Sequence, residues 1–257
     1  MEDSHLLVRR EGRVAWVEYN RPPVNVVDWE TLRAIPRVLS GLLADDQVRV
    51  IVIGSAVEGY FSVGADLTLF RGLGPQGMRE WMTLCHDVVR TMRQSPKPLL
   101  AAIRGTAVGA GFEVTLHCDL RFASQDSRLG QPEVEIGVIP GVGTTQALVR
   151  LLGRSRALRL LYEGTLVSAR EAHEMGLIDF VCPPERLLHD VRQYATSVAG
   201  KPTHCLAAIR RTITIGGGLT FDEGLRVEFD AEVGLAGTPD FAEGVAAFLE
   251  KRIPRWA

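Results

Sequence analysis

The chain has 257 residues, 46% of them hydrophobic and 23% charged, and its formal net charge is −2. This composition belongs to a folded globular protein with a substantial core, not to a disordered or fibrous chain. The near-zero charge argues against a nucleic-acid partner, which would require a basic stripe. No segment approaches the ~18 successive apolar residues of a membrane-spanning helix.

Strand and helix patterns alternate through the first two thirds of the chain. Residues 14–19 (VAWVEY) are typical of a strand, and Asp28 suits the N-cap of a helix running toward Leu43. Pro36 should kink or split this helix, because proline lacks the N–H of the helical ladder. The alternation predicts an α/β architecture. The later predicted elements are strands over 48–53, 99–104, 119–124, 127–133 and 177–181, and helices over 79–94, 144–152, 156–162 and 169–175.

From Glu185 onward the patterns are helical almost throughout, separated by Gly200-Lys201-Pro202 and by three glycines at 216–218. We therefore predict an α/β core over residues 1–190 and a C-terminal α-helical region over residues 191–257. Several of these helices have wide apolar faces, which would pack either on their own core or on another subunit.

The cysteines and the N-terminal segment favour a cytoplasmic protein. The segment MEDSHLLVRREGR carries early acidic residues and no long apolar run, unlike a secretory signal. The cysteines are widely spaced and form no CxxC pair, so they fit neither a zinc site nor a disulfide framework. We expect reduced, buried thiols at Cys85, Cys118, Cys182 and Cys205.

Three loops rich in small residues follow predicted strands, where ligands bind in α/β sheets. They are 61–66 (FSVGAD), 109–113 (GAGFE), and 130–133 (GQPE) with the following 137–143 (GVIPGVG). The GxGxxG spacing, the Gly-Lys-Ser/Thr of a nucleotide loop and the GxSxG elbow of hydrolases are all missing from the sequence. His117 lies four residues after Glu113, but one histidine and one glutamate make a poor metal site, and a structural role for His117 is the stronger expectation.

Backbone amides at these loops suit an anionic oxygen. The first N–H groups of a helix have no partner within the helix, and the helix dipole adds to their attraction for negative charge. Two such amides from different loops would form an oxyanion hole. The small side chains of Ala65 and Ala110 would let a ligand approach closely.

Four segments together resemble the crotonase, or enoyl-CoA hydratase/isomerase, superfamily: YFSVGAD, AVGAGFEVTLHCD, GQPEVEIGVIPGVGTTQAL and GTLVSAREAHEMGLID. The similarity runs from about Val14 to the C-terminal DFAEGVAAFLEKR. The resemblance implies a crotonase-like spiral of ββα units with a C-terminal helical region that builds a homo-oligomer, either a trimer or a dimer of trimers.

The resemblance also assigns roles within the site. It places the oxyanion amides at Ala65 and Ala110, the two catalytic carboxylates at Glu113 and Glu133, and an amide that holds the reacting water at Gly141. Many relatives keep only one of the two acids, so the presence of both favours hydration. Two neighbouring carboxylates repel when both are ionised, so one should hold a proton at neutral pH.

Coenzyme A contacts are implied at Asp66, Leu67, Thr68 and Lys251. Hydratases commonly have a lysine where this chain has Thr68, which weakens the expected hold on CoA. Lys251 matches a lysine that reaches a phosphate, but a solvated helix-end lysine is an equal alternative.

Four further side chains near these loops are not expected to take part in catalysis. In an extended segment Glu135 would point away from Glu133, so we expect no role for it. The bulky residues Phe61, Phe70 and Trp81 would line an acyl pocket or, as the stronger expectation, belong to the core.

The resulting hypothesis is an enoyl-CoA hydratase that adds water in the syn sense to a trans-2-enoyl-CoA. The partner is an acyl-CoA thioester, with no nucleic acid and no membrane. No metal or redox cofactor is expected, since coenzyme A enters as part of the substrate. The alternatives are a double-bond isomerase working through Glu133 alone, a hydratase or C–C lyase for aromatic or branched acyl-CoA, and a non-catalytic acyl-CoA-binding scaffold.

Overall fold

The computed structural model describes residues 5–256 and contains two mixed sheets. Residues 1–4 and 257, at the ends of the two predicted regions, lie outside the described residues. The larger sheet has the order β1-β2-β3-β5-β7-β10, with only the β1–β2 pair antiparallel. Its strands are β1 (Leu6–Glu11), β2 (Val14–Tyr19), β3 (Val50–Ser55), β5 (Leu99–Ile103), β7 (Leu120–Ser124) and β10 (Phe180–Cys182).

The smaller sheet has the order β4-β6-β8-β9, with β8 and β9 antiparallel and the other pairs parallel. Its strands are β4 (Tyr60–Ser62), β6 (Thr106–Val108), β8 (Arg128–Gly130) and β9 (Leu166–Ser168). The chain passes from a strand of the larger sheet to a strand of the smaller one and then to a helix, three times in succession. The helices of these turns are α2 (Pro75–Arg93), α3 (Gly109–Thr115) and α4 (Thr144–Leu152). This repetition is a spiral of ββα units, which confirms the predicted fold class.

The spiral brings three loops to one edge. Strands β4, β6 and β8 are parallel neighbours, so their carboxyl ends lie side by side. Residues 63–66 follow β4, residues 109–113 follow β6, and residues 131–133 follow β8. The three small-residue loops found in the sequence therefore meet because their strands pair.

Both faces of the larger sheet are buried, as parallel strands require. Alternate residues of β2, β3 and β5, such as Val17, Ile53 and Ile103, point into the main core between the layers. On the opposite face Trp16 and Val52 pack against α7 (Leu187–Ala199). The predicted boundary at residue 190 falls within this helix and stays a prediction. All four cysteines are free thiols; three are buried, and Cys205 is half-buried.

Local signals account for the remaining elements and for two differences from expectation. Helix α1 (Trp29–Ala44) begins at the predicted cap, where the Asp28 carboxylate accepts from the Thr31 N–H at 2.8 Å. It runs through Pro36 without being split, because its buried side chains hold both halves to the core. Helix α2 begins earlier than predicted, because Pro75 fits the first helical position. The other elements of this region are α5 (Arg154–Glu163), α6 (Ala169–Glu174) and the 3₁₀ helices η1 (Leu67–Phe70) and η2 (Pro132–Ile136).

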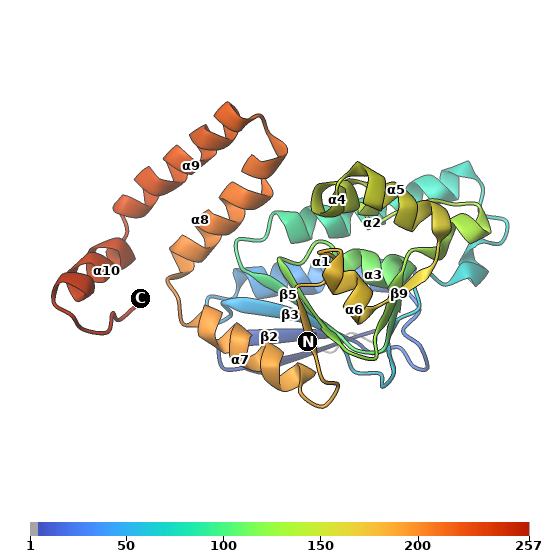
Figure 1. Ribbon diagram of the computed structural model, residues 1–257, viewed down its shortest axis with the longest axis horizontal. Helices are drawn as coiled ribbons and strands as arrows, with labels where there is room; N and C mark the ends of the chain where they lie inside the picture. Colours follow the sequence, from blue (N-terminus) through green and yellow to red (C-terminus); the bar gives the residue numbers. More distant parts are fainter. Residues whose placement is uncertain (1–4, 257) are drawn as a thin grey trace.

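The C-terminal helices form an arm that extends away from the sheets (Figure 1). The arm consists of α8 (Thr203–Thr214), the short 3₁₀ helix η3 (Gly216–Gly218), α9 (Phe221–Ala236) and α10 (Pro239–Leu249). Arg210 lies in α8, the first helix of the arm, and joins it to the core. Its guanidinium group forms an ion pair with Asp119 at 2.9 Å and donates to the Met92 carbonyl at 2.8 Å. Within residues 5–256 no helix is both long enough and apolar enough to cross a bilayer.

Candidate active site

A cavity of about 220 Å³ opens where the three loops meet. Ala65, Ala110, Glu113, Glu133 and Gly141 all line it. The structure therefore brings together the two amide-bearing residues, both acids and the predicted water-holding glycine, although they are distant in the sequence.

Two glycines set how closely the loops approach. Gly64 and Gly109 have φ angles of +87° and +53°, which L side chains rarely adopt. A Cβ on Gly64 would lie 3.0 Å from the Val108 carbonyl oxygen and 3.4 Å from the Ala110 nitrogen. A Cβ on Gly109 would lie 3.0 Å from Oε1 of Glu133. The backbones of the first two loops and the Glu133 carboxyl group are thus in near contact, and no side chain fits between them.

The amides of Ala65 and Ala110 are donors without an acceptor among residues 5–256. Loop 63–66 is tied to the segment before α1, since Val27 N–H donates to the Gly64 carbonyl and Asp66 N–H donates to the Val27 carbonyl, each at 2.8 Å. The N–H of Ala65, between these bonds, has no acceptor within residues 5–256. Ala110 is the second residue of α3, so its N–H has no partner inside the helix and meets none elsewhere in the described chain. The cavity therefore has two unpaired amide donors in its wall.

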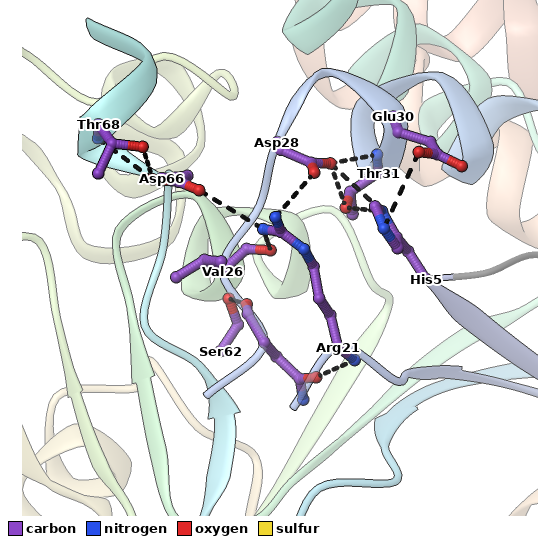
Figure 2. A network of polar contacts seen from close by, with 10 residues as sticks. His5, Arg21, Val26, Asp28, Glu30, Thr31, Ser62, Asp66 and Thr68 are labelled. Carbon is purple, nitrogen blue, oxygen red and sulfur yellow. Dashed lines mark hydrogen bonds and ion pairs between the residues drawn. The ribbon is translucent and has the colours of Figure 1, made fainter. Parts of the chain in front are cut away.

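A network of charged residues holds the Ala65 loop from behind. Figure 2 shows Arg21 between two carboxylates, with guanidinium distances of 3.1 Å to Asp28 and 3.7 Å to Asp66. Arg21 also donates to the Val26 carbonyl at 3.1 Å. The Thr68 hydroxyl donates to Asp66 at 2.6 Å and lies outside the cavity lining. In place of the lysine that the resemblance leads one to expect, this chain has a threonine within η1 that donates to Asp66, the N-cap of that helix.

Glu113 is held at the cavity wall by three donors. Its carboxylate accepts from the N–H of Gly141 at 3.3 Å, the N–H of Val142 at 2.7 Å and the hydroxyl of Thr144 at 2.7 Å. The side chain is nearly inaccessible, with the residue only 2% exposed. Burial raises the pKa of Glu113 to about 7, and the three hydrogen bonds act in the opposite direction by stabilising the carboxylate.

Glu133 faces the same space from η2 with fewer donors. Burial and the charge of Glu113 raise the pKa of Glu133 to about 7. The amide group of the fully buried Gln131 lies 3.1 Å from both carboxyl oxygens of Glu133. Its NH₂ group can donate to an ionised Glu133, and its oxygen can accept from a protonated one. Because both pKa values are raised and the charge of Glu113 acts on Glu133, the two acids should titrate as a coupled pair.

The rest of the wall is apolar, with one exception. Phe70 and Trp81 line the cavity and meet edge to face at 5.1 Å, whereas Phe61 is fully buried in the core. Glu135 also lines the cavity, but its carboxylate lies against Gly164, with Oε1 3.5 Å from where a Cβ on that residue would be, so the expectation that it has no role stays a prediction. That expectation assumed an extended chain, but residues 132–136 form a 3₁₀ turn, in which side chains two apart do not alternate between faces.

Two sequence candidates lie elsewhere. Lys251 follows α10 on the C-terminal arm and is exposed. His117 is buried behind Glu113, where its Nε2 donates to the Val142 carbonyl at 2.6 Å. Within residues 5–256 there is no group of three side chains suited to hold a metal ion.

Sequence reasoning missed two residues of the site, Val142 and Thr144. Both hold Glu113, one through its amide and one through its hydroxyl. The available signal was the GVGTT segment, where a glycine with φ of +70° at position 143 precedes the helix that begins at Thr144.

Comparison with known proteins identifies the family of the chain. The family model described as enoyl-CoA hydratase/isomerase matches residues 9–257. The chain is 33% identical over 253 residues to the crotonyl-CoA hydratase of Syntrophomonas wolfei, and 32% identical over 253 residues to the short-chain-enoyl-CoA hydratase of Clostridium acetobutylicum. Each match covers 98% of this chain and 97% of the relative. The crystal structure of an enoyl-CoA hydratase from Bacillus anthracis matches with a TM-score of 0.93 at 32% identity, covering 98% of both chains. Sequence and structure together show that this chain belongs to the enoyl-CoA hydratase/isomerase family, the crotonase superfamily.

Proposed function

We propose that the protein is an enoyl-CoA hydratase, a hydro-lyase that adds water in the syn sense to a trans-2-enoyl-CoA to give a 3-hydroxyacyl-CoA. One observation carries the proposal: Glu113 and Glu133 face one apolar cavity that also contains two unpaired backbone amides. The names of the relatives support the same activity, since they are hydratases of crotonyl-CoA and of short-chain enoyl-CoA.

The arrangement suits each part of the reaction. The thioester oxygen accepts from the amides of Ala65 and Ala110, which stabilise the negative charge that develops on it. Glu113 removes a proton from water as the water oxygen bonds to C3, and Glu133 delivers its proton to C2. Water is thereby added across the double bond, and the proton gained by Glu113 must return to Glu133 before the next turnover. No step uses a metal or a redox cofactor, and coenzyme A enters with the substrate.

The surroundings of the two acids favour this division of roles. Glu113 accepts three hydrogen bonds from groups that stabilise its ionised form, as a general base requires. Glu133 lies against the charge of Glu113, which favours its protonated form, as a general acid requires. With one proton between them, the pair is therefore ready for hydration near pH 7.

The test uses purified protein and crotonyl-CoA, followed by loss of absorbance at the enoyl-thioester band. We expect turnover in the wild type and its loss in Glu113→Gln, with Glu58→Gln as an exposed control. Assaying a 3-enoyl-CoA in parallel separates the isomerase alternative, which needs only Glu133. Hydration that survives in Glu113→Gln would contradict the mechanism, and binding of acyl-CoA without turnover would favour a scaffold.

We infer further that the protein works as a homo-oligomer, either a trimer or a dimer of trimers. The C-terminal arm exposes large apolar side chains, and α9 buries none of its described residues. Such a surface is too apolar to remain in water on a stable monomer. The exposed apolar residues of the arm include Ile213, Phe221, Phe229, Phe248, Leu249 and Ile253. Lys251 belongs to this arm, so contact with a CoA phosphate would be across subunits.

A further inference from the structure

His117 is a buried polar residue that the proposed mechanism leaves without a role. Glu113 lies in the last turn of α3, and His117 lies in the turn that follows the helix. Both reach the segment that links η2 to α4. Glu113 accepts from the N–H of Val142 at 2.7 Å, and His117 contacts the carbonyl oxygen of the same residue at 2.6 Å. Val142 is therefore held on both sides.

The chemistry of this contact fixes the state of the ring. A carbonyl oxygen accepts but cannot donate, so Nε2 of His117 must carry the hydrogen. Burial lowers the pKa of His117 to about 4, with the positive charges of Arg93 and Arg121 acting in the same direction, so the ring is neutral near pH 7. Nδ1 of this tautomer is a buried lone pair with no partner within residues 5–256. The ring thus makes one directed side-chain hydrogen bond, and that bond is to Val142.

The packing leaves the linking segment little freedom near the ring. Gly143 has a φ of +70°, and a Cβ there would lie 3.1 Å from both Cε1 and Nε2 of His117. Val142 is 1% exposed and the His117 residue 7% exposed, so water cannot readily replace either partner. If the bond from His117 were lost, the Val142 carbonyl would be buried without a donor, and its peptide would tend to rotate. The carbonyl belongs to the peptide unit that joins Val142 to Gly143. Because this unit shares the Val142 Cα with the preceding unit, its rotation would also displace the Val142 N–H from Glu113.

We propose that His117 is a positioning residue that aims the Val142 amide at Glu113 and thereby fixes both the place and the acidity of the general base. This inference rests on the proposed function for its kinetic consequences, but the hold on Glu113 exists without substrate. The groups that face Glu113 are Glu133, Cys85 and the three donors from residues 141–144. Among these groups, Val142 is the one that His117 contacts and orients.

The experiment compares three substitutions at position 117. His117→Leu removes the donor, His117→Gln places an amide N–H near the position of Nε2, and His117→Asn is too short to reach Val142. With crotonyl-CoA we expect kcat of the Leu and Asn variants to fall about 10-fold, with KM within about twofold of wild type, and the Gln variant to recover to within about threefold. The control is Val191→Ala, which changes a buried residue of α7. Val191 belongs to the hydrophobic cluster between α7 and the larger sheet, away from the cavity, so this variant shows the effect of lowered stability alone.

A second readout does not depend on turnover. Titration of ¹³C-labelled glutamate by NMR, with the Glu113 signal assigned from Glu113→Gln, should show a higher pKa of Glu113 in the Leu and Asn variants and a restored one in Gln. Unchanged kcat and an unchanged pKa of Glu113 in variants that lose thermal stability would reduce His117 to a purely structural residue. A wild type that hydrates no enoyl-CoA would contradict the proposed function, while the NMR comparison would still decide the role of His117.

Discussion

Replacing Glu113 with Gln should stabilise the fold while removing activity. The pKa of Glu113 rises from its ordinary 4.5 to about 7 because the side chain is buried. At about 1.4 kcal/mol per pKa unit, keeping the ionised carboxylate buried costs about 3 kcal/mol of folding free energy. Glutamine is of similar size, carries no charge, and its oxygen can still accept from the amides of residues 141 and 142. The variant therefore avoids most of this cost.

The sign of the effect depends on pH. Below pH 4.5 the carboxyl group is protonated in both the folded and the unfolded chain, so wild type and variant should have similar stability. As the pH rises from 4.5 through 7, the unfolded chain releases the proton first, and the wild type loses the stability that the variant keeps.

The assay for this prediction is thermal unfolding between pH 4.5 and pH 8. For a chain of this size about 3 kcal/mol corresponds to roughly 6–12 °C in Tm, so the variant should unfold that much higher at pH 8. The control Glu58→Gln should show no such pH-dependent gap. A Glu113→Gln variant that is no more stable than wild type at pH 8 would refute the reasoning.

Three other perturbations test separate parts of the site and of the arm. Gly64→Ala forces a side chain into a φ of +87° and against the Val108 carbonyl, so kcat with crotonyl-CoA should fall at least about 100-fold as the oxyanion loop moves; an unchanged kcat would argue against the loop. Glu133→Gln removes the proton donor and should lower kcat about 100-fold or more, while calorimetry shows acyl-CoA binding retained. In Glu113→Gln, NMR should show a lower pKa of Glu133, because the neighbouring negative charge is gone, and an unmoved pKa would show that the two acids do not interact. Phe229→Asp combined with Phe248→Asp should give monomers in light scattering, and an unchanged mass would exclude this face from the interface.

Secondary-structure elements that depend on residue types at neighbouring positions could be predicted from the sequence, and so could their order along the chain. The buried strands, the Asp28 cap and the limits of α4 follow from residue types at neighbouring positions. The meeting of Ala65, Ala110, Glu113 and Glu133 could not be derived from spacing, because it results from the pairing of β4, β6 and β8. Only the family resemblance suggested it beforehand.

What the sequence did not indicate depends on backbone geometry and on tertiary hydrogen bonds. The conformation around Glu135 was not predicted, because an alternating pattern cannot reveal that residues 132–136 form a 3₁₀ turn. Thr144 and Val142 were missed because their bonds to Glu113 join segments about thirty residues apart, each of which reads as an ordinary loop or helix start. The contact from His117 belongs to the same category, since a lone histidine in a helical segment gives no sign of its partner.

The spiral itself explains why the two acids lie twenty residues apart in the sequence, and this leads to a final prediction. Strands β6 and β8 pair in a fixed register, with Thr106 opposite Arg128 and Val108 opposite Gly130, so one turn of the spiral separates the loops that carry Glu113 and Glu133. Inserting one residue after Leu129 would change which residue stands at the Gly130 position, where a Cβ would lie 2.6 Å from Cδ2 of Leu166.

The insertion would also displace Glu133 from its place beside Gly109, because the strand cannot absorb an extra residue without shifting its register. We expect no detectable hydration of crotonyl-CoA from that variant. A one-residue insertion after Gly12, in the exposed turn between β1 and β2 and remote from the cavity, should leave kcat within about twofold. If the variant with the insertion after Leu129 kept wild-type kcat, the position of Glu133 would not depend on the register of β8, and the spiral could not be what sets the spacing of the two acids.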